Sequence, residues 1–149
     1  MKFLLDTDSI SFLFAKSGDY HKKISQKFSL LKDDDIVQVS FMTIFELEYS
    51  CSNATDSIKR KEIRDTIENT KQKFEIVPLK IEYSSIYGEV KTKLKNHWGS
   101  TTKGMRKHNV DLMIASTAIS ESSTLIANDE IYKVLMQIHP PFQYQNWTL

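Results

Sequence analysis

Two acidic residues stand directly after short apolar runs of this sequence. Asp6 follows the run Phe3–Leu5, and Asp129 follows the run Thr124–Ala127 after one intervening residue. Short apolar runs of this kind predict buried parallel strands. Ligands and catalytic groups in open parallel sheets gather at the carboxyl ends of the strands. We therefore expect these two carboxylates, though distant in sequence, to approach each other.

Two further acids belong to apolar segments with helical character. Glu46 lies between Phe45 and Leu47, where a charge is costly unless it is paired or faces a cleft or a metal ion. Asp111 opens the apolar segment Val110–Ser120, where a carboxylate suits the positive end of a helix dipole. Each of the four acids alone also fits a plainer role, as a strand end, helix cap, turn or solvated residue. Their combination is what points to a site.

Four converging carboxylates without equal basic partners would repel one another and raise their pKa values. A divalent cation relieves this repulsion, and oxygen ligands suit Mg²⁺ or Mn²⁺. An ion held in this way can polarise a phosphoryl oxygen and generate a hydroxide-like water. The chemistry predicted from these residues is phosphodiester hydrolysis that depends on Mg²⁺ or Mn²⁺.

The elements that must position these acids alternate along the chain. Strands are expected at Phe3–Leu5, Ile36–Ser40, Phe74–Leu79 and Thr124–Ala127, with an edge strand within Phe142–Trp147. Helices are expected after Asp8 or Ser9, at Tyr20–Leu31, Thr43–Tyr49, Ile58–Lys73, Ile81–Trp98 and Val110–Ser120, and from Ile131. Alternation of this kind predicts an α/β fold with a parallel sheet, and 149 residues fit one domain, 1–149.

The bulk composition is that of an ordinary globular protein. The formal net charge is +1, so nothing resembles a strongly cationic nucleic-acid binder. The single cysteine, Cys51, favours a reducing compartment. The N-terminal apolar run is too short for a signal peptide, and no run is long enough to span a membrane. We expect a cytoplasmic protein without a membrane partner.

One basic segment lies next to the predicted acidic site. It precedes Asp111 and contains Lys103, Arg106, Lys107 and His108. A nuclease must guide the phosphate backbone with such residues. A solvated charged surface explains the same segment about equally well, so these four residues are candidates for RNA binding.

Five segments, in order along the chain, resemble motifs of the PIN-domain ribonucleases of the VapC-like toxin type. The chain opens with Leu4-Leu5-Asp6-Thr7-Asp8 and continues with the Ser-x-x-Thr-x-x-Glu-Leu-like segment Ser40–Leu47. It then carries Asn109–Ala115, Leu125–Asp129 and the closing pair Asn146-Trp147. Each motif is weak singly, but the ordered set covers almost the whole chain. Asp8 departs from the pattern, because Asn is common at that position.

The resemblance implies a fold, a site and partners. The fold would be a PIN-like three-layer α/β/α sandwich with a mainly parallel central sheet of four or five strands. Asp6, Glu46, Asp111 and Asp129 would be the catalytic, metal-binding acids of an endoribonuclease. The groups that support them or position the substrate would be Thr7, Asp8, Ser40, Thr43 and Asn128. The partners would be an RNA substrate, a cognate antitoxin and a second copy of the chain in a homodimer.

Two other functions remain open from the sequence. Asp6-Thr7-Asp8 also resembles the start of haloacid-dehalogenase-like phosphatases, which would give Ser40 a role but leave Glu46 and Asp111 unexplained. Alternatively, the acids are vestigial and the chain is a catalytically silent nucleic-acid-binding or regulatory module.

Overall fold

A parallel β-sheet forms the centre of the molecule in the computed structural model, which describes residues 1–149. The strands are β1 (Lys2–Leu5), β2 (Ile36–Ser40), β3 (Glu75–Val77), β4 (Thr124–Ile126) and β5 (Gln143–Gln145). Their order is β3-β2-β1-β4-β5, and every neighbouring pair is parallel. The prediction of a mainly parallel sheet of four or five strands is therefore confirmed, and β5 lies at an edge as expected.

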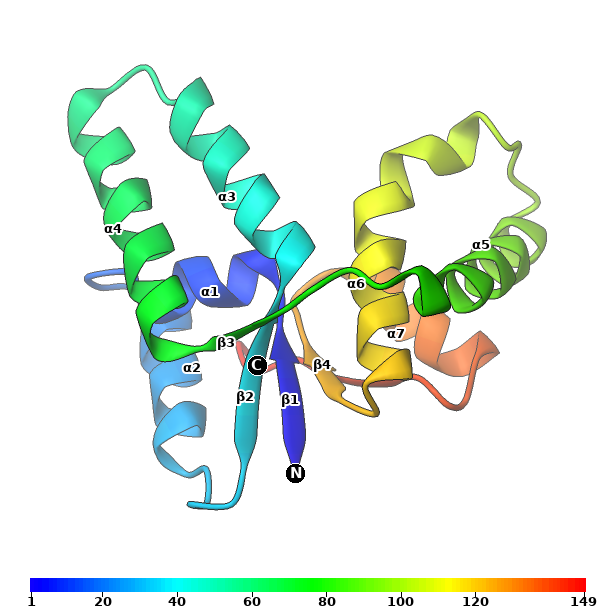
Figure 1. Cartoon of the computed structure of the whole chain (residues 1–149), viewed down its shortest axis with the longest axis horizontal. Helices are drawn as coiled ribbons and strands as arrows, with labels where there is room; N and C mark the ends of the chain where they lie inside the picture. Colours follow the sequence, from blue (N-terminus) through cyan, green and yellow to red (C-terminus); the bar gives the residue numbers. More distant parts are fainter.

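Helices cover both faces of this sheet (Figure 1). On one side lie α1 (Thr7–Leu13), α2 (Asp19–Ser29), α3 (Phe41–Asn53) and α4 (Ser57–Lys73). On the other lie α5 (Ser84–Trp98), α6 (Asn109–Ser120) and α7 (Glu130–Ile138). Two short 3-10 helices, η1 (Ile81–Tyr83) and η2 (Gly104–His108), precede α5 and α6. The result is the expected three-layer α/β/α sandwich.

Side chains of the central strands alternate between two apolar cores. Leu4 and Leu125, which are paired in the β1–β4 register, point into the core beneath α5, α6 and α7. Phe3, Leu5 and Ile126 point into the opposite core with α1 to α4. Because successive strand side chains face opposite sides, a strand buried on both faces must be apolar throughout. This explains why Phe3-Leu4-Leu5 was readable as a strand from the sequence.

The order of the strands places a switch point next to β1. From β1 the chain continues to β2 and β3 on one side, and it later returns to β4 and β5 on the other. Helices α1, α3 and α7 follow the carboxyl ends of β1, β2 and β4. Clefts in open α/β sheets form at such a point, between chain segments that leave in opposite directions.

Several helix starts differ from those expected. Asp6, and neither Asp8 nor Ser9, caps α1: the Ser9 N–H donates to Asp6 Oδ1 at 2.8 Å. Asp111 is the third residue of α6, whose N-cap is His108, so a capping role for Asp111 is wrong. The basic segment before it is helical, since η2 ends at His108.

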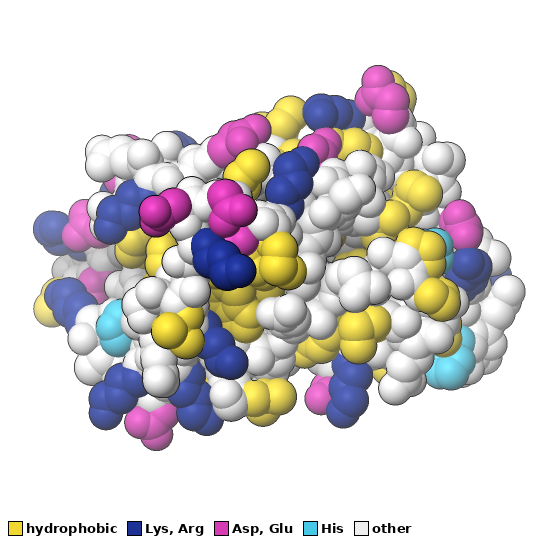
Figure 2. Space-filling model, turned by 90° about the horizontal axis from the view of Figure 1, so that it is seen from below, with side chains coloured by type: hydrophobic (Ala, Val, Ile, Leu, Met, Phe, Trp, Pro, Cys, Tyr) yellow, Lys and Arg dark blue, Asp and Glu magenta, His cyan; other side chains and the backbone are white.

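No helix is both long and apolar enough to span a bilayer. Figure 2 shows the molecule from the side where the N-terminus lies. Lys and Arg side chains are interspersed with Asp and Glu side chains over this face. No extended basic surface is seen on this face.

Candidate active site

All four acids singled out from the sequence line one cleft at the carboxyl ends of the strands. The cleft has a volume of about 620 Å³ and contains Asp6, Glu46, Asp111 and Asp129. A fifth acid, Asp8, also lines it, whereas no Lys or Arg does. The structure therefore brings five carboxylates to one cleft without a matching set of cations in its wall.

Hydrogen bonds fix Asp6 at the junction of β1, β4 and α1. Its backbone N–H donates to the Ile126 carbonyl at 3.1 Å, and its carboxylate accepts from the Ser9 N–H. The Ser9 hydroxyl donates to the same Ile126 carbonyl at 2.8 Å. Because Asp6 directly follows β1 and caps α1, its carboxylate is held in place at the cleft.

A threonine connects α1 to Glu46 on α3. The Thr7 hydroxyl donates to Glu46 Oε1, and both residues line the cleft. Ser40 caps α3 through a 3.2 Å hydrogen bond from the Met42 N–H, and thereby sets the start of the helix that carries Glu46. The Thr43 side chain is fully buried, and its hydroxyl has no hydrogen-bond partner.

Asp111 and Asp129 reach the cleft from α6 and from the start of α7. Asp129 caps α7, because its Oδ1 accepts from the Ile131 N–H at 3.0 Å. His108 Nδ1 lies 3.6 Å from Asp111 Oδ2. Asn128 does not line the cleft; its Oδ1 accepts from Asn146 Nδ2 at 2.8 Å and ties β4 to the C-terminal segment.

Burial dominates the electrostatics of Asp6, which is 6% exposed. It raises the pKa of this carboxyl from its ordinary 3.8 to about 7. Hydrogen bonds from Ser9 offset part of the rise, while the charges of Asp8 and Glu46 add to it. Asp6 is thus ionised at neutral pH only at a free-energy cost to the fold.

Asp8, Glu46 and Asp111 also have raised pKa values. For Asp8, burial and then the charge of Asp129 raise the pKa. For Glu46, burial acts first, followed by the charges of Asp111 and Asp8. The pKa of Asp111 is also raised by burial and by Asp129, with His108 acting in the opposite direction. Such mutual repulsion is what a bound cation relieves.

The donor set fits a hydrated divalent ion better than a closed protein cage. No three of the chain's acidic, histidine or cysteine side chains are close enough together to ligate one ion directly. Mg²⁺ keeps several waters and is commonly held through one or two carboxylates. The carboxylates are spread around a cleft that has room for a hydrated ion.

The structure separates the four basic candidates into two pairs. Lys107 and His108 line a neighbouring hollow of about 570 Å³, which shares Asp129 with the acidic cleft. The Trp98 ring lies beside His108, with ring centroids 5.2 Å apart. Lys103 and Arg106 line neither hollow. Lys107 and His108 are therefore the two basic candidates that lie next to the acidic cleft.

Aromatic residues of the cleft were not singled out from the sequence. Phe45 and Tyr49, on α3, line it and are 54% and 71% exposed. Tyr132, on α7, lines it from beneath and is 1% exposed. The available signals were the four-residue spacing from Phe45 to Tyr49 and the position of Tyr132, three residues after Asp129. Neither distinguishes a cleft residue from ordinary helix packing.

The PIN-domain family matches residues 3–135, a range that includes every acid of the cleft. The chain belongs to the PIN-domain family. This PIN domain is thus not a haloacid-dehalogenase-like phosphatase. Among curated proteins it is similar to Ribonuclease VapC2 of Rickettsia felis, with 28% identity over 148 residues that cover 99% of the chain and 98% of the relative.

Solved structures resemble this PIN domain over nearly their whole length. A crystal structure of VapBC2 from Rickettsia felis, bound to a promoter DNA fragment, matches with a TM-score of 0.76 at 25% identity and covers 99% of each chain. VapBC-1 from nontypeable Haemophilus influenzae matches with a TM-score of 0.76 at 25% identity and covers 100% of each chain. A member of the VapBC family of toxin-antitoxin systems from Mycobacterium tuberculosis has a TM-score of 0.70 at 18% identity, with 97% of this chain and 98% of that chain covered.

Proposed function

We propose that this PIN domain is a metal-dependent endoribonuclease and the toxin of a toxin–antitoxin pair. The observation that carries the proposal is the cleft, which is lined by five carboxylates and by no Lys or Arg. The similarity to a ribonuclease over almost the full chain supports RNA as the substrate. The similarity to VapBC complexes supports a cognate antitoxin and an assembly of more than one chain, which we propose to be built on a homodimer.

Asp6, Glu46, Asp111 and Asp129 would hold hydrated Mg²⁺ or Mn²⁺ in this cleft, one or two of them directly and the others through water bound to the ion. When bound, the ion supplies a Lewis acid for a phosphoryl oxygen and a low-pKa water as nucleophile. Thr7 orients Glu46 through its hydroxyl, and the cap at Asp6 fixes a second carboxylate. Asp8, which also lines the cleft, adds negative charge that strengthens cation binding. Asp8 is therefore proposed to support the ion site.

Purified protein incubated with total RNA tests the proposal. Cleavage is expected with Mg²⁺ or Mn²⁺ and should stop in EDTA and in the variant Glu46→Gln. Glu48→Gln is a matched control, because Glu48 pairs with Arg64 and does not line the cleft. RNA binding without cleavage would instead support a silent binding module. Sequencing of the cut ends would identify the RNA and the cleavage site.

A phosphate contact is proposed for Lys107, which lines the hollow next to Asp129. Lys107→Ala should weaken RNA binding uniformly across sequences and reduce the salt slope of binding by about 1. Lys103→Ala is the control from the same segment, since Lys103 lines neither hollow, and it should change little. Filter-binding measurements over a range of salt concentrations compare the two. Equal effects of the two substitutions on RNA binding would contradict a specific phosphate contact at Lys107.

The exposed rings on α3 offer stacking surfaces for unpaired bases. Stacking on an aromatic side chain contributes about 1–3 kcal/mol per base and needs no positive charge. Tyr49→Ala is therefore expected to raise the KM for RNA by roughly 10-fold. Tyr49→Phe should behave as the wild type, and so should Tyr20→Ala, which removes a 47% exposed ring outside the cleft. An unchanged KM for Tyr49→Ala would show that no RNA base stacks on the Tyr49 ring.

A further inference from the structure

A second hollow adjoins the acidic cleft on the side of α1 and α3. It has a volume of about 590 Å³, and the residues that it shares with the cleft are Thr7, Asp8, Tyr49 and Ser50. The hollow that contains Lys107 adjoins the cleft elsewhere, through Asp129, and shares no residue with this one. Figure 1 shows α3 and α4 on one side of the molecule and α6 and α7 on the other. The acidic cleft therefore opens into two separate hollows.

Helix α3 forms a wall of both the cleft and the second hollow. Glu46 lines the cleft, Ser50 lines both, and Asn53 lines the hollow. Spacings of three and four residues place these side chains on one face of the helix. At a rise of 1.5 Å per residue, this face extends about 10 Å from Glu46 to Asn53. Ser50 and Asn53 are exposed, so a ligand that leaves the cleft along α3 can contact both.

The second hollow contains one free cation. Lys59, which is exposed, is the only Lys or Arg that lines it. Each of the other cations of α4 has a partner in the protein: Lys61 pairs with Asp65, Arg64 and Lys71 with Glu48, Arg60 with the Ala54 carbonyl and Lys73 with the Phe14 ring. Two acids also line the hollow. Asp56 accepts a hydrogen bond from the Ile58 N–H at 3.0 Å, and Asp8 lies at the edge shared with the cleft.

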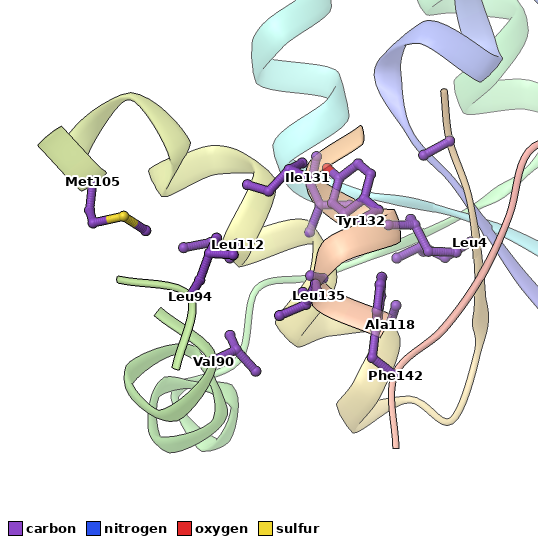
Figure 3. Packing of buried hydrophobic residues seen from close by; sticks show 14 of the residues in the cluster. Leu4, Val90, Leu94, Met105, Leu112, Ala118, Ile131, Tyr132, Leu135 and Phe142 are labelled. Carbon is purple, nitrogen blue, oxygen red and sulfur yellow. The ribbon is translucent and has the colours of Figure 1, made fainter. Parts of the chain in front are cut away.

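The aromatic rings that are free to stack also lie on the α3 side. Tyr49 is 71% exposed and lines both the cleft and the second hollow. Tyr132 lines the cleft too, but its ring packs among apolar side chains of the core, 6.1 Å from the Phe142 ring (Figure 3). Because Tyr132 is 1% exposed, its face is closed to a base. A base that enters the cleft therefore finds an exposed ring where the second hollow begins.

We propose that the second hollow binds the part of a single-stranded RNA substrate on one side of the cut, and the hollow with Lys107 the part on the other side. The inference rests on the proposed function, because it concerns the same substrate. Lys59 would contact a phosphate, and Asn53 a phosphate or ribose oxygen, which are the groups that such side chains bind in nucleic acids. A cation combined with an exposed ring is typical of single-strand binding, since only unpaired bases are free to stack.

Shortened substrates test this division. The probe is a synthetic RNA that contains the mapped cut site, with two shorter forms that lack the nucleotides before or after the site. On the full-length RNA, Lys59→Ala and Asn53→Ala should each raise KM about 5-fold and leave kcat unchanged. On one of the shorter RNAs, both variants should have the KM that the wild type has on that RNA. Lys107→Ala should lose its effect only on the other.

The matched controls are Lys61→Ala on α4 and Ser52→Ala on α3. Lys61 pairs with Asp65 at 3.0 Å, and neither Lys61 nor Ser52 lines the second hollow. Both variants should have the wild-type KM on all three RNAs. If the wild type cleaves RNA but Lys59→Ala and Asn53→Ala leave KM unchanged, the inference is wrong and the nuclease stands. Loss of the Lys59 and Lys107 effects on the same shortened RNA would also overturn it. A wild-type protein that does not cleave RNA would overturn the proposed function, and this inference with it.

Discussion

Replacing Asp6 by Asn is expected to abolish RNA cleavage and at the same time to stabilise the fold at pH 8. Activity should fall at least about 100-fold, because even the partners of metal ligands cost 10–100-fold when lost. Stability should rise because the pKa of Asp6 increases from 3.8 to about 7 on folding. At about 1.4 kcal/mol per pKa unit, the ionised carboxylate costs the fold roughly 4 kcal/mol. Asn keeps the capping oxygen for the Ser9 N–H but carries no charge.

Urea unfolding in EDTA and an RNA cleavage assay with Mg²⁺ measure the two effects. Asp56→Asn is the matched control, since Asp56 caps α4 through the Ile58 N–H and lies outside the acidic cleft. That variant should change neither activity nor the pH dependence of stability. Full activity of Asp6→Asn would contradict the assignment of the site. A clear loss of stability would contradict the buried-charge account of Asp6.

The second large effect concerns pH and divalent ions together. In EDTA, the stability of the wild type relative to Asp6→Asn should fall as the pH rises from about 4 to about 7, and then level off. The folded protein binds the Asp6 proton more tightly than the unfolded chain does in this range, so raising the pH favours unfolding. The pKa values of Asp8, Glu46 and Asp111 are raised in the same direction.

Mn²⁺ should reverse this trend, because it binds ionised carboxylates and competes with protons. At 100 times its dissociation constant, an ion stabilises the folded state by about 2.7 kcal/mol, or roughly 5–10 °C in unfolding temperature. The gain at pH 8 should exceed the gain at pH 5. Thermal unfolding of both proteins, with and without Mn²⁺ at the two pH values, measures it. An equal gain at the two pH values would show that the carboxylates do not take part in binding.

The fold was predictable where burial dictates the residue type. Phe3-Leu4-Leu5 lies between two cores, so only apolar residues fit, and the run shows in the sequence. Helix starts were less predictable, because several polar residues in a row can cap a helix. At the end of β1, the backbone turns at Asp6, so Asp6 rather than Asp8 meets the free N–H of Ser9.

The site was predictable where an acid follows a strand or interrupts an apolar helix. Asp6 and Asp129 were predicted as site residues because they follow strands, and Glu46 because its neighbours are apolar. The position of Tyr132 in the site was not predictable, because a tyrosine in an apolar helix usually belongs to the core. Here its side chain packs in the core and also lines the cleft. Lys107 lines the hollow beside the cleft and Lys103 does not. This difference depends on the backbone path of η2, which residue spacing does not predict.

Anomalous diffraction from crystals grown with Mn²⁺ is the most direct test of the proposed ion site. The account predicts a manganese peak in the cleft between Asp6, Glu46, Asp111 and Asp129, and no such peak in crystals of Asp6→Asn. Crystals of the wild type with no manganese in this cleft, at concentrations that support RNA cleavage, would contradict it.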